Sequence, residues 1–264
     1  MRRDHEPEVL LLGGTANRGN VVRIGDTVRR PLRATSTSTH ALLRHLAAVG
    51  FAGAPRFLGV DEQGREVLSF VPGDAVTPPY PLSALTDEAL VSVALLLREY
   101  HEAVSTFDAG PFAWPASPPT PCAGEIVSHN DLNLDNVVFR GGRAVALIDF
   151  DLASPGSRVW DVACAARLWA PLRPDHHIRD ARRGRALDRF RLLVDAYGLT
   201  GADRDRVVDA VLHNHDWSYD IVGTAAERGH AAFSDYWANG AMVRARETRE
   251  WYLEQGDRLR RALD

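Results

Sequence analysis

The chain contains 264 residues, and this length favours two lobes over a single core. Hydrophobic residues make up 45% and charged residues 25% of the chain, a composition that excludes global disorder. The net charge of −4 excludes a general field that would attract nucleic acid or an anionic membrane, so we expect neither as a partner.

The cellular compartment is predicted from the segments that the sequence lacks. The apolar run at residues 9–12 is too short for a signal-peptide core, and no run of about 18 apolar residues could cross a membrane. We therefore expect a cytoplasmic protein. Cys122 and Cys164 lie far apart and lack a second metal-type pair, which predicts buried free thiols.

The N-terminal part of the chain is predicted to have the order β-β-β-α-β-β. Residues 9–31 alternate β-rich runs with turn residues, which indicates three antiparallel strands. Leucines at helical spacing over residues 40–49 predict a helix that stops at Gly50. Two further strands are expected on either side of the turn at residues 62–64.

The rest of the chain is predicted to be mainly helical, which makes the fold class α+β. Thr86 is placed to cap a long helix that runs to about residue 107. The five prolines of residues 110–121 predict an irregular connection, and Gly141-Gly142 predicts the turn of a hairpin. Further helices are expected near residues 160–170, 184–197, 203–219 and 233–262.

The stretch that indicates chemistry reads HNDLNLDN from His129 to Asn136, followed by the hairpin and then by Asp149. The hairpin should bring Asn136 and Asp149 together in space. Phosphoryl transfer from ATP needs one carboxylate that orients the attacking hydroxyl and further oxygen ligands for Mg²⁺. We predict that Asp131 orients the hydroxyl and that Asn136 and Asp149 hold the metal. Asp151 is left open between a solvated acid and a contact to a second metal or the substrate.

These motifs resemble those of a known family. HNDLNLDN is similar to the HxDxxxxN loop of aminoglycoside phosphotransferases and choline kinase-like enzymes, and LIDFD is similar to their metal-binding strand end. Within this pattern His129 stands with Asp131 in the catalytic loop, and we expect it to brace the loop backbone rather than to move protons. Asp161 matches the acidic position at which the next helix opens and braces the catalytic loop.

The resemblance covers most of the chain and implies a two-lobed protein kinase-like fold that uses ATP and Mg²⁺. Its nucleotide-binding lobe would span residues 1–71, and its catalytic and acceptor-binding lobe residues 72–264. The segments GDTVRRP, LLRHLAAVGFAGAPRFLG and GREVLSFVPGD resemble the trifolitoxin-immunity-type subgroup.

The nucleotide side of the site is less sharply marked. The family resemblance implies a phosphate cradle in the first strand-strand loop, a cation on the third strand and adenine contacts at the connection between the lobes. The matching residues are Gly14, Thr15 and Asn17 for the cradle, Arg30 or Arg29 for the cation, and Ser69 and Val71 for adenine. We prefer Arg30, because Val28 would face adenine from the same side of the strand.

One departure from the family pattern lies in the helix that follows. Residues 35–59 contain no Glu or Asp, so the acidic partner of the cation is missing and Thr39 and His40 occupy its place. We therefore expect the cation to be held by phosphate alone. On a late helix, Asp216 and Asp220 could meet a cationic acceptor, although a solvated face is the simpler interpretation.

The leading hypothesis is an ATP- and Mg²⁺-dependent phosphotransferase that acts on a hydroxyl group of a small molecule. An aminoglycoside, an amino alcohol, a sugar or another antibiotic is left open as acceptor, as are the choice of ATP or GTP and the oligomeric state. A second hypothesis is a nucleotide-binding pseudokinase or immunity protein that binds a toxin or peptide. Metal-dependent hydrolysis is disfavoured, because the ligands are too few for a two-metal site.

Overall fold

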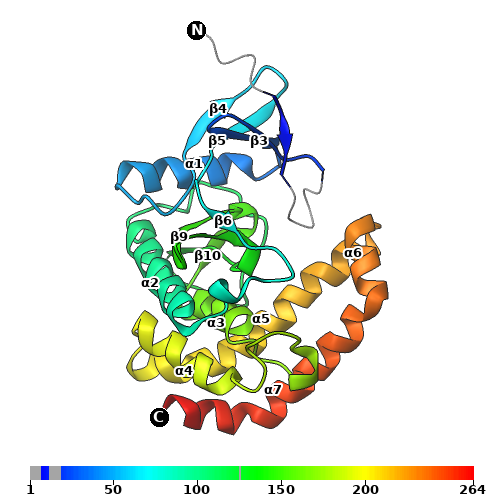
Figure 1. Cartoon of the computed structure of the whole chain (residues 1–264). Helices are drawn as coiled ribbons and strands as arrows, with labels where there is room; N and C mark the ends of the chain where they lie inside the picture. The colour runs from blue at the N-terminus through cyan, green and yellow to red at the C-terminus, as the bar shows by residue number, and fades with distance from the viewer. Residues whose placement is uncertain (1–6, 12–18, 125) are drawn as a thin grey trace.

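The computed structural model describes residues 7–11, 19–124 and 126–264. It shows a small antiparallel sheet above a mainly helical body, so the predicted α+β class is confirmed (Figure 1). Within the described ranges, none of the helices is both long enough and apolar enough to cross a membrane.

Five antiparallel strands and one helix form the N-terminal part, in the predicted order. They are β1 (Val9–Leu10), β2 (Val22–Ile24), β3 (Thr27–Pro31), α1 (Ser36–Ala48), β4 (Phe57–Val60) and β5 (Arg65–Ser69). The strands lie side by side in the order β1-β2-β3-β5-β4. Helix α1 begins ahead of the predicted start because its first turn is a Ser-Thr run, whose weak helix propensity gave no sequence signal.

Two small sheets follow, and they carry the residues of the predicted catalytic loop and hairpin. Their strands are β6 (Asp74–Ala75), β7 (Ile126–Ser128), β8 (Val137–Arg140), β9 (Arg143–Leu147) and β10 (Ser154–Gly156). Strand β8 pairs with both β6 and β9, and β7 pairs with β10. Gly141 and Gly142 form the hairpin turn with φ of 57° and 77°, a left-handed pair that favours glycine.

Six helices make up most of the remaining chain. They are α2 (Asp87–Val104), α3 (Arg158–Trp169), α4 (Ala186–Tyr197), α5 (Gly201–Glu227), α6 (Ala231–Tyr236) and α7 (Met242–Leu263). Short 3₁₀ turns cover Leu82–Ala84, Thr120–Cys122, Leu134–Asn136, Phe150–Leu152 and Asp175–His177. Thr86 caps α2 as predicted, because its side-chain oxygen accepts a hydrogen bond from Ala89 N at 3.1 Å.

The last helices differ from the sequence prediction. Helix α5 extends to Glu227, and the single helix expected over residues 233–262 is divided into α6 and α7 by the π-helical segment Trp237–Ala241. Gly240 takes a φ of 84° there, which helical backbone does not allow. With the turn between α5 and α6, this break gives α5, α6 and α7 the form of a curved arm (Figure 1).

Helix α2 runs through the centre of the core. It packs against α4 and β9 and buries Leu90, Val93 and Leu97 completely or almost completely. Trp160 and Trp169 of α3 are also fully buried, so these two tryptophans are core residues. Both cysteines are buried free thiols, as the sequence predicts.

The contribution of this core to stability can be measured at Leu97 of α2. Leu97→Ala is expected to lower the free energy of unfolding by about 2–5 kcal/mol, because Leu97 is 1% exposed and its removal leaves a cavity. Leu253→Ala on α7 is the control, since Leu253 is 60% exposed. Chemical denaturation that gave equal losses for the two variants would contradict this view of the core.

Candidate active site

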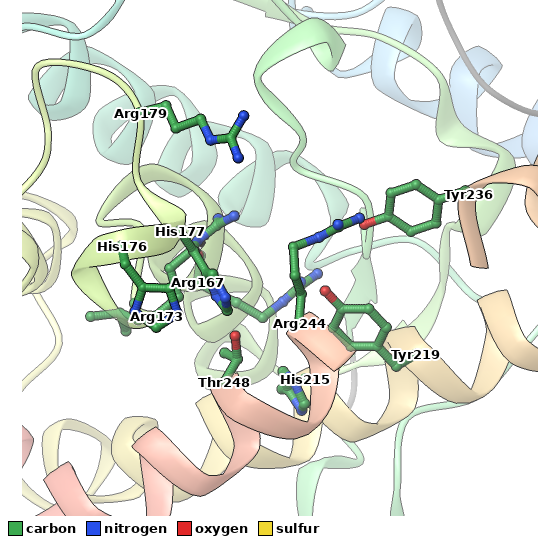
Figure 2. A pocket seen from close by; sticks show the side chains of 11 residues that line it. Arg167, Arg173, His176, His177, Arg179, His215, Tyr219, Tyr236, Arg244 and Thr248 are labelled. Atoms are coloured by element: carbon green, nitrogen blue, oxygen red, sulfur yellow. Dashed lines mark hydrogen bonds between the residues drawn. The ribbon is translucent and has the colours of Figure 1, made fainter. Parts of the chain in front are cut away.

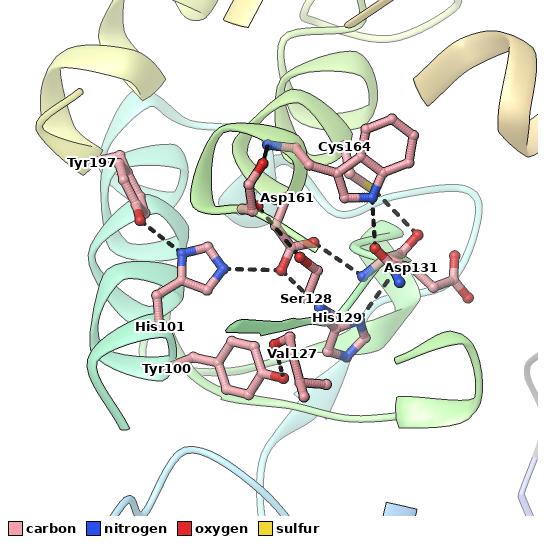
Figure 3. Close-up of polar contacts among 12 residues, drawn as sticks. Tyr100, His101, Val127, Ser128, His129, Asp131, Asp161, Cys164 and Tyr197 are labelled. Carbon is pink, nitrogen blue, oxygen red and sulfur yellow. Dashed lines mark hydrogen bonds and ion pairs between the residues drawn. The ribbon is translucent and has the colours of Figure 1, made fainter. Parts of the chain in front are cut away.

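A fully buried carboxylate, that of Asp161, holds the loop that follows β7 (Figure 3). Its oxygens accept hydrogen bonds from the backbone N–H groups of His129 and Asn130, at 2.7 and 3.0 Å. His101 Nε2 from α2 lies 3.0 Å from Asp161 Oδ2, and His101 Nδ1 lies 2.7 Å from the hydroxyl of Tyr197 in α4. A buried polar chain therefore joins three helices to the loop.

This polar chain keeps Asp161 ionised despite its burial. Burial alone would raise the pKa of Asp161, but the hydrogen bonds from His101 and from the backbone N–H of His129 hold that pKa below its ordinary value. An ionised carboxylate can accept from both backbone N–H groups at once. The loop is thus fixed by a charge in the first turn of α3, which is the bracing that the family resemblance implies.

Asn130 is a loop residue that sequence reasoning missed. Its φ of 66° lies in the left-handed region, which Asn tolerates better than most residues. Its Nδ2 donates to Leu152 O at 2.8 Å and to Ser154 Oγ at 2.7 Å, and its Oδ1 accepts from Trp160 Nε1 at 2.7 Å. The available signal was the residue type, because an Asn between two motif residues can satisfy such a turn.

His129 connects the loop to the end of the hairpin. Its Nε2 lies 3.0 Å from the carbonyl oxygen of Ile148, the residue before Asp149. Burial lowers the pKa of His129, which favours the neutral ring. A neutral imidazole can donate one hydrogen bond to this carbonyl, and the loop and the strand end are thereby held together.

Asp131 lies within this loop and contacts two asparagines. Asn133 Nδ2 donates to Asp131 Oδ1 at 2.5 Å, and Asn136 Nδ2 donates to Asp131 Oδ2 at 3.0 Å. Burial, and then the charges of Asp149 and Asp135, raise the pKa of Asp131 to about 7. The structure therefore brings Asp131 and Asn136 into direct contact and places the charge of Asp149 near them.

Arg30 is buried among three carboxylates. Its Nε lies 2.5 Å from Glu66 Oε1, its Nη1 lies 2.8 Å from Asp149 Oδ1, and its Nη2 lies 2.7 Å from Asp151 Oδ1. Although burial opposes the charge, these three carboxylates raise the pKa of Arg30 above its ordinary value. Asp151, which the sequence left open, is also 2.6 Å from Arg33 Nε. Here Asp151 contacts two cations and is not simply solvated.

The expectation that the strand-three cation lacks an acidic partner is wrong. Glu66 lies directly opposite Arg30 in the antiparallel pairing of β3 with β5, so the acid comes from the sheet. Helix α1 supplies His40, whose Nε2 lies 2.7 Å from Glu66 Oε2. His40 of the helix thus positions the acid, and the acid itself, Glu66, lies on β5. A search confined to the helix could not find Glu66.

A cavity of about 370 Å³ lies between the N-terminal sheet and the hairpin. Its apolar walls include Val28, Leu68, Val138 and Ile148. Its polar lining includes Arg30, Asn136 and Asp149. Apolar walls with a few converging polar groups are typical of a small-molecule site.

The predicted nucleotide-binding residues differ in their relation to this cavity. Ser69 and Val71 line it, together with Arg30. Arg29 is absent from the described lining, and its Nε lies 3.5 Å from Asp61 Oδ2. The predicted cradle residues lie outside the described part of the chain: Gly14, Thr15 and Asn17.

Comparisons with known proteins agree with this geometry. Residues 113–193 match the model of the phosphotransferase enzyme family. Over 222 residues the chain is 34% identical to the trifolitoxin immunity protein of Rhizobium leguminosarum bv. trifolii, an alignment that covers 78% of this chain and 79% of that protein. The chain belongs to the phosphotransferase enzyme family.

Solved structures show that its fold is the two-lobed kinase-like fold of this family. A choline/ethanolamine kinase family protein from Mesorhizobium loti superposes with a TM-score of 0.63 at 18% identity, covering 98% of this chain and 92% of that one. The aminoglycoside phosphotransferase APH(2″)-IIa, solved with streptomycin and ATP, gives 0.52 at 14% identity, with 85% and 89% covered. The fold predicted from the motifs is confirmed.

The role of Glu66 in this phosphotransferase family member can be tested by a substitution that keeps the size of the side chain and removes its charge. Glu66→Gln should lower the free energy of unfolding by about 3–5 kcal/mol, because it breaks a buried ion pair and leaves Arg30 short of one partner. Glu62→Gln, at an exposed position of the turn between β4 and β5, is the matched control. If denaturation showed the two variants to be equally stable, Glu66 would not be the partner that fixes Arg30.

Proposed function

We propose that this chain transfers the γ-phosphoryl group of ATP to a hydroxyl group of a small molecule. The observation that carries the proposal is that Arg30, Asn136 and Asp149 line one cavity while Asn136 contacts Asp131. The ATP complex of APH(2″)-IIa supports ATP as the nucleotide. Residues 1–71 would form the nucleotide-binding lobe and 72–264 the catalytic and acceptor lobe, since the chain leaves the first sheet after β5 and enters the next at β6.

Asn136 and Asp149 are the residues that would hold Mg²⁺, and their chemistry fits the ion. The amide nitrogen of Asn136 is used by Asp131, which leaves its amide oxygen for a cation. Asp149 has a second carboxylate oxygen beyond the one that Arg30 contacts. Mg²⁺ prefers oxygen ligands of these two kinds, and when bound it neutralises charge on the phosphates.

Asp131 is the residue that would accept the proton in the reaction. The acceptor hydroxyl oxygen forms a bond to the γ-phosphorus, while the bond from that phosphorus to the β,γ-bridging oxygen breaks and ADP leaves with its electron pair. Asp131 takes the hydroxyl proton. Arg30 directs three of its N–H groups at carboxylates. Its remaining N–H groups would donate to phosphate oxygens. Its carboxylate partners hold the guanidinium in position for this contact.

The alternative, a nucleotide-binding protein that confers immunity without catalysis, is favoured by one observation. The curated relative is called an immunity protein. The missing helix acid no longer supports this alternative, because Glu66 provides the acid. Measurement of ADP release across a panel of hydroxyl compounds separates the two, since only the phosphotransferase proposal requires acceptor-dependent turnover.

Mg²⁺-ATP should stabilise the folded protein, by about 2.7 kcal/mol when it is present at 100 times its dissociation constant. Asp149→Ala should weaken the part of this effect that depends on Mg²⁺, because it removes a carboxylate ligand. Thermal unfolding and calorimetry with and without Mg²⁺ provide the measurement, with Asp205→Ala at an exposed position of α5 as control. Failure of the parent protein to bind nucleotide with Mg²⁺ or Mn²⁺ would rule out both the phosphotransferase and the nucleotide-binding immunity protein.

Asp131→Asn should reduce kcat by about 10²–10⁴ once an acceptor is found, because the amide cannot take the hydroxyl proton. The raised pKa of Asp131 means that its negative charge disfavours the folded state, so removal of the charge should cost little stability. The free energy of unfolding of the variant should lie within about 1 kcal/mol of that of the parent. Its affinity for Mg²⁺-ATP should stay nearly unchanged. Asp188→Asn at an exposed position of α4 is the control. Full activity in Asp131→Asn would transfer the role to another residue.

A further inference from the structure

A second cavity of about 330 Å³ lies in the helical part of the molecule, between α5, α7 and the segment after α3 (Figure 2). Its most unusual feature is its basic lining. The guanidinium groups come from Arg167, Arg173, Arg179 and Arg244. His176, His177 and His215 add three imidazoles to the same lining.

The four arginines of this basic cavity make no ion pair with a carboxylate among the described residues. Their recorded partners are neutral. Arg167 donates to Asn214 Oδ1 at 3.0 Å and to Ser218 Oγ at 3.1 Å. Arg244 donates to Asn239 O at 3.0 Å. By contrast, Arg30 in the other cavity contacts three carboxylates.

The acids near this cavity have other cationic or histidine partners. Asp180 pairs with Arg182 at 2.7 Å, and this hydrogen bond, together with the charge of Arg173, lowers the pKa of Asp180. Glu247 Oε2 lies 3.2 Å from His176 Nε2 and 2.9 Å from His177 Nε2. Asp216 lies 2.9 Å from His215 Nδ1 and 3.1 Å from Arg249 Nε. Burial lowers the pKa of Arg173, and the charge of Arg167 lowers it further, which indicates mutual repulsion of the cations. An anion in the cavity would relieve that repulsion.

Arg167 connects this cavity to the catalytic loop. Cys164 Sγ, three residues before Arg167 on α3, lies 3.4 Å from the carbonyl oxygen of Asn130, the residue before Asp131. Helix α3, which carries Arg167, also contacts the loop through Trp169 Nε1, which donates to Leu132 O at 2.9 Å. A molecule with a hydroxyl at Asp131 would therefore extend toward the arginines.

We propose that the acceptor is a small hydroxyl compound bearing a carboxylate or phosphate, whose anionic group is bound by Arg173, Arg179 and Arg244. This inference rests on the proposed function and names the substrate class for it. Arginine forks match carboxylate and phosphate oxygens in pairs, and the cavity has the volume of a small-molecule site. The same field repels the cationic amino groups of amino sugars and amino alcohols.

The test compares three six-carbon hydroxyl compounds that differ in charge, together with inorganic phosphate as a bare anion. Inorganic phosphate, gluconate, glucose and glucosamine are titrated at low ionic strength by calorimetry, without nucleotide, into three proteins. These are the parent, the double variant Arg179→Gln/Arg244→Gln, and Arg258→Gln as control. Arg179 is exposed and Arg244 half-buried, and the double variant leaves Arg167 and Arg173 in place. Arg258 is exposed on α7, the helix of Arg244, and is not part of the described lining.

Phosphate and gluconate are expected to bind the parent and Arg258→Gln equally, and the double variant at least about tenfold more weakly. Equal anion affinity in all three proteins, no anion binding to the parent, or tighter binding of glucosamine than of gluconate would each overturn the inference. Mg²⁺-ATP binding is measured separately. Its absence would defeat the proposed function but not the anion result, so the two failures are distinguishable.

Discussion

The buried guanidinium of Arg30 is the contact on which the geometry of the candidate site depends. It joins β3 to β5 through Glu66, and it joins the N-terminal sheet to the catalytic hairpin through Asp149 and Asp151. A buried cation with fewer partners would be costly, so the two parts of the fold must meet at this point. The position of the hairpin end relative to the sheet is therefore set by one ion cluster.

A second buried charge organises the other side of the site. Asp161 holds the backbone of the loop, and His129 ties that loop to the carbonyl of Ile148. Two non-glycine residues, Asn130 and Asp149, adopt left-handed backbone at the ends of this connection. Such conformations persist when surrounding contacts over-determine them, which the hydrogen bonds to Asp161 and Arg30 do here. Loop and strand end are thus held in place by contacts within the protein.

Local patterns predicted most of the fold and the catalytic loop, because strands, caps and the HNDLNLDN motif depend on residues close in sequence. The failures concern one contact between distant residues and one local break in a helix. Glu66 became the partner of Arg30 only through the register of β3 with β5, and the break at Gly240 came from backbone that no periodicity marks. The expected roles of the motif residues remain predictions, while their mutual placement is a property of the structure.

The distribution of charge over the surface is a second property that the sequence alone did not predict. The net charge of −4 averages over the whole chain and therefore does not show where charges of one sign gather. Arg167 lies on α3, Arg173 and Arg179 in the segment after it, and Arg244 on α7, so only the curved arm of the last helices brings them to one cavity. The chain turns back between α5 and α6, where Gly229 takes a φ of 79°, so α6 and α7 return along α5 (Figure 1). This turn depends on backbone that composition does not reveal, and the α5 acids Asp216 and Asp220 are not part of the described lining of the basic cavity.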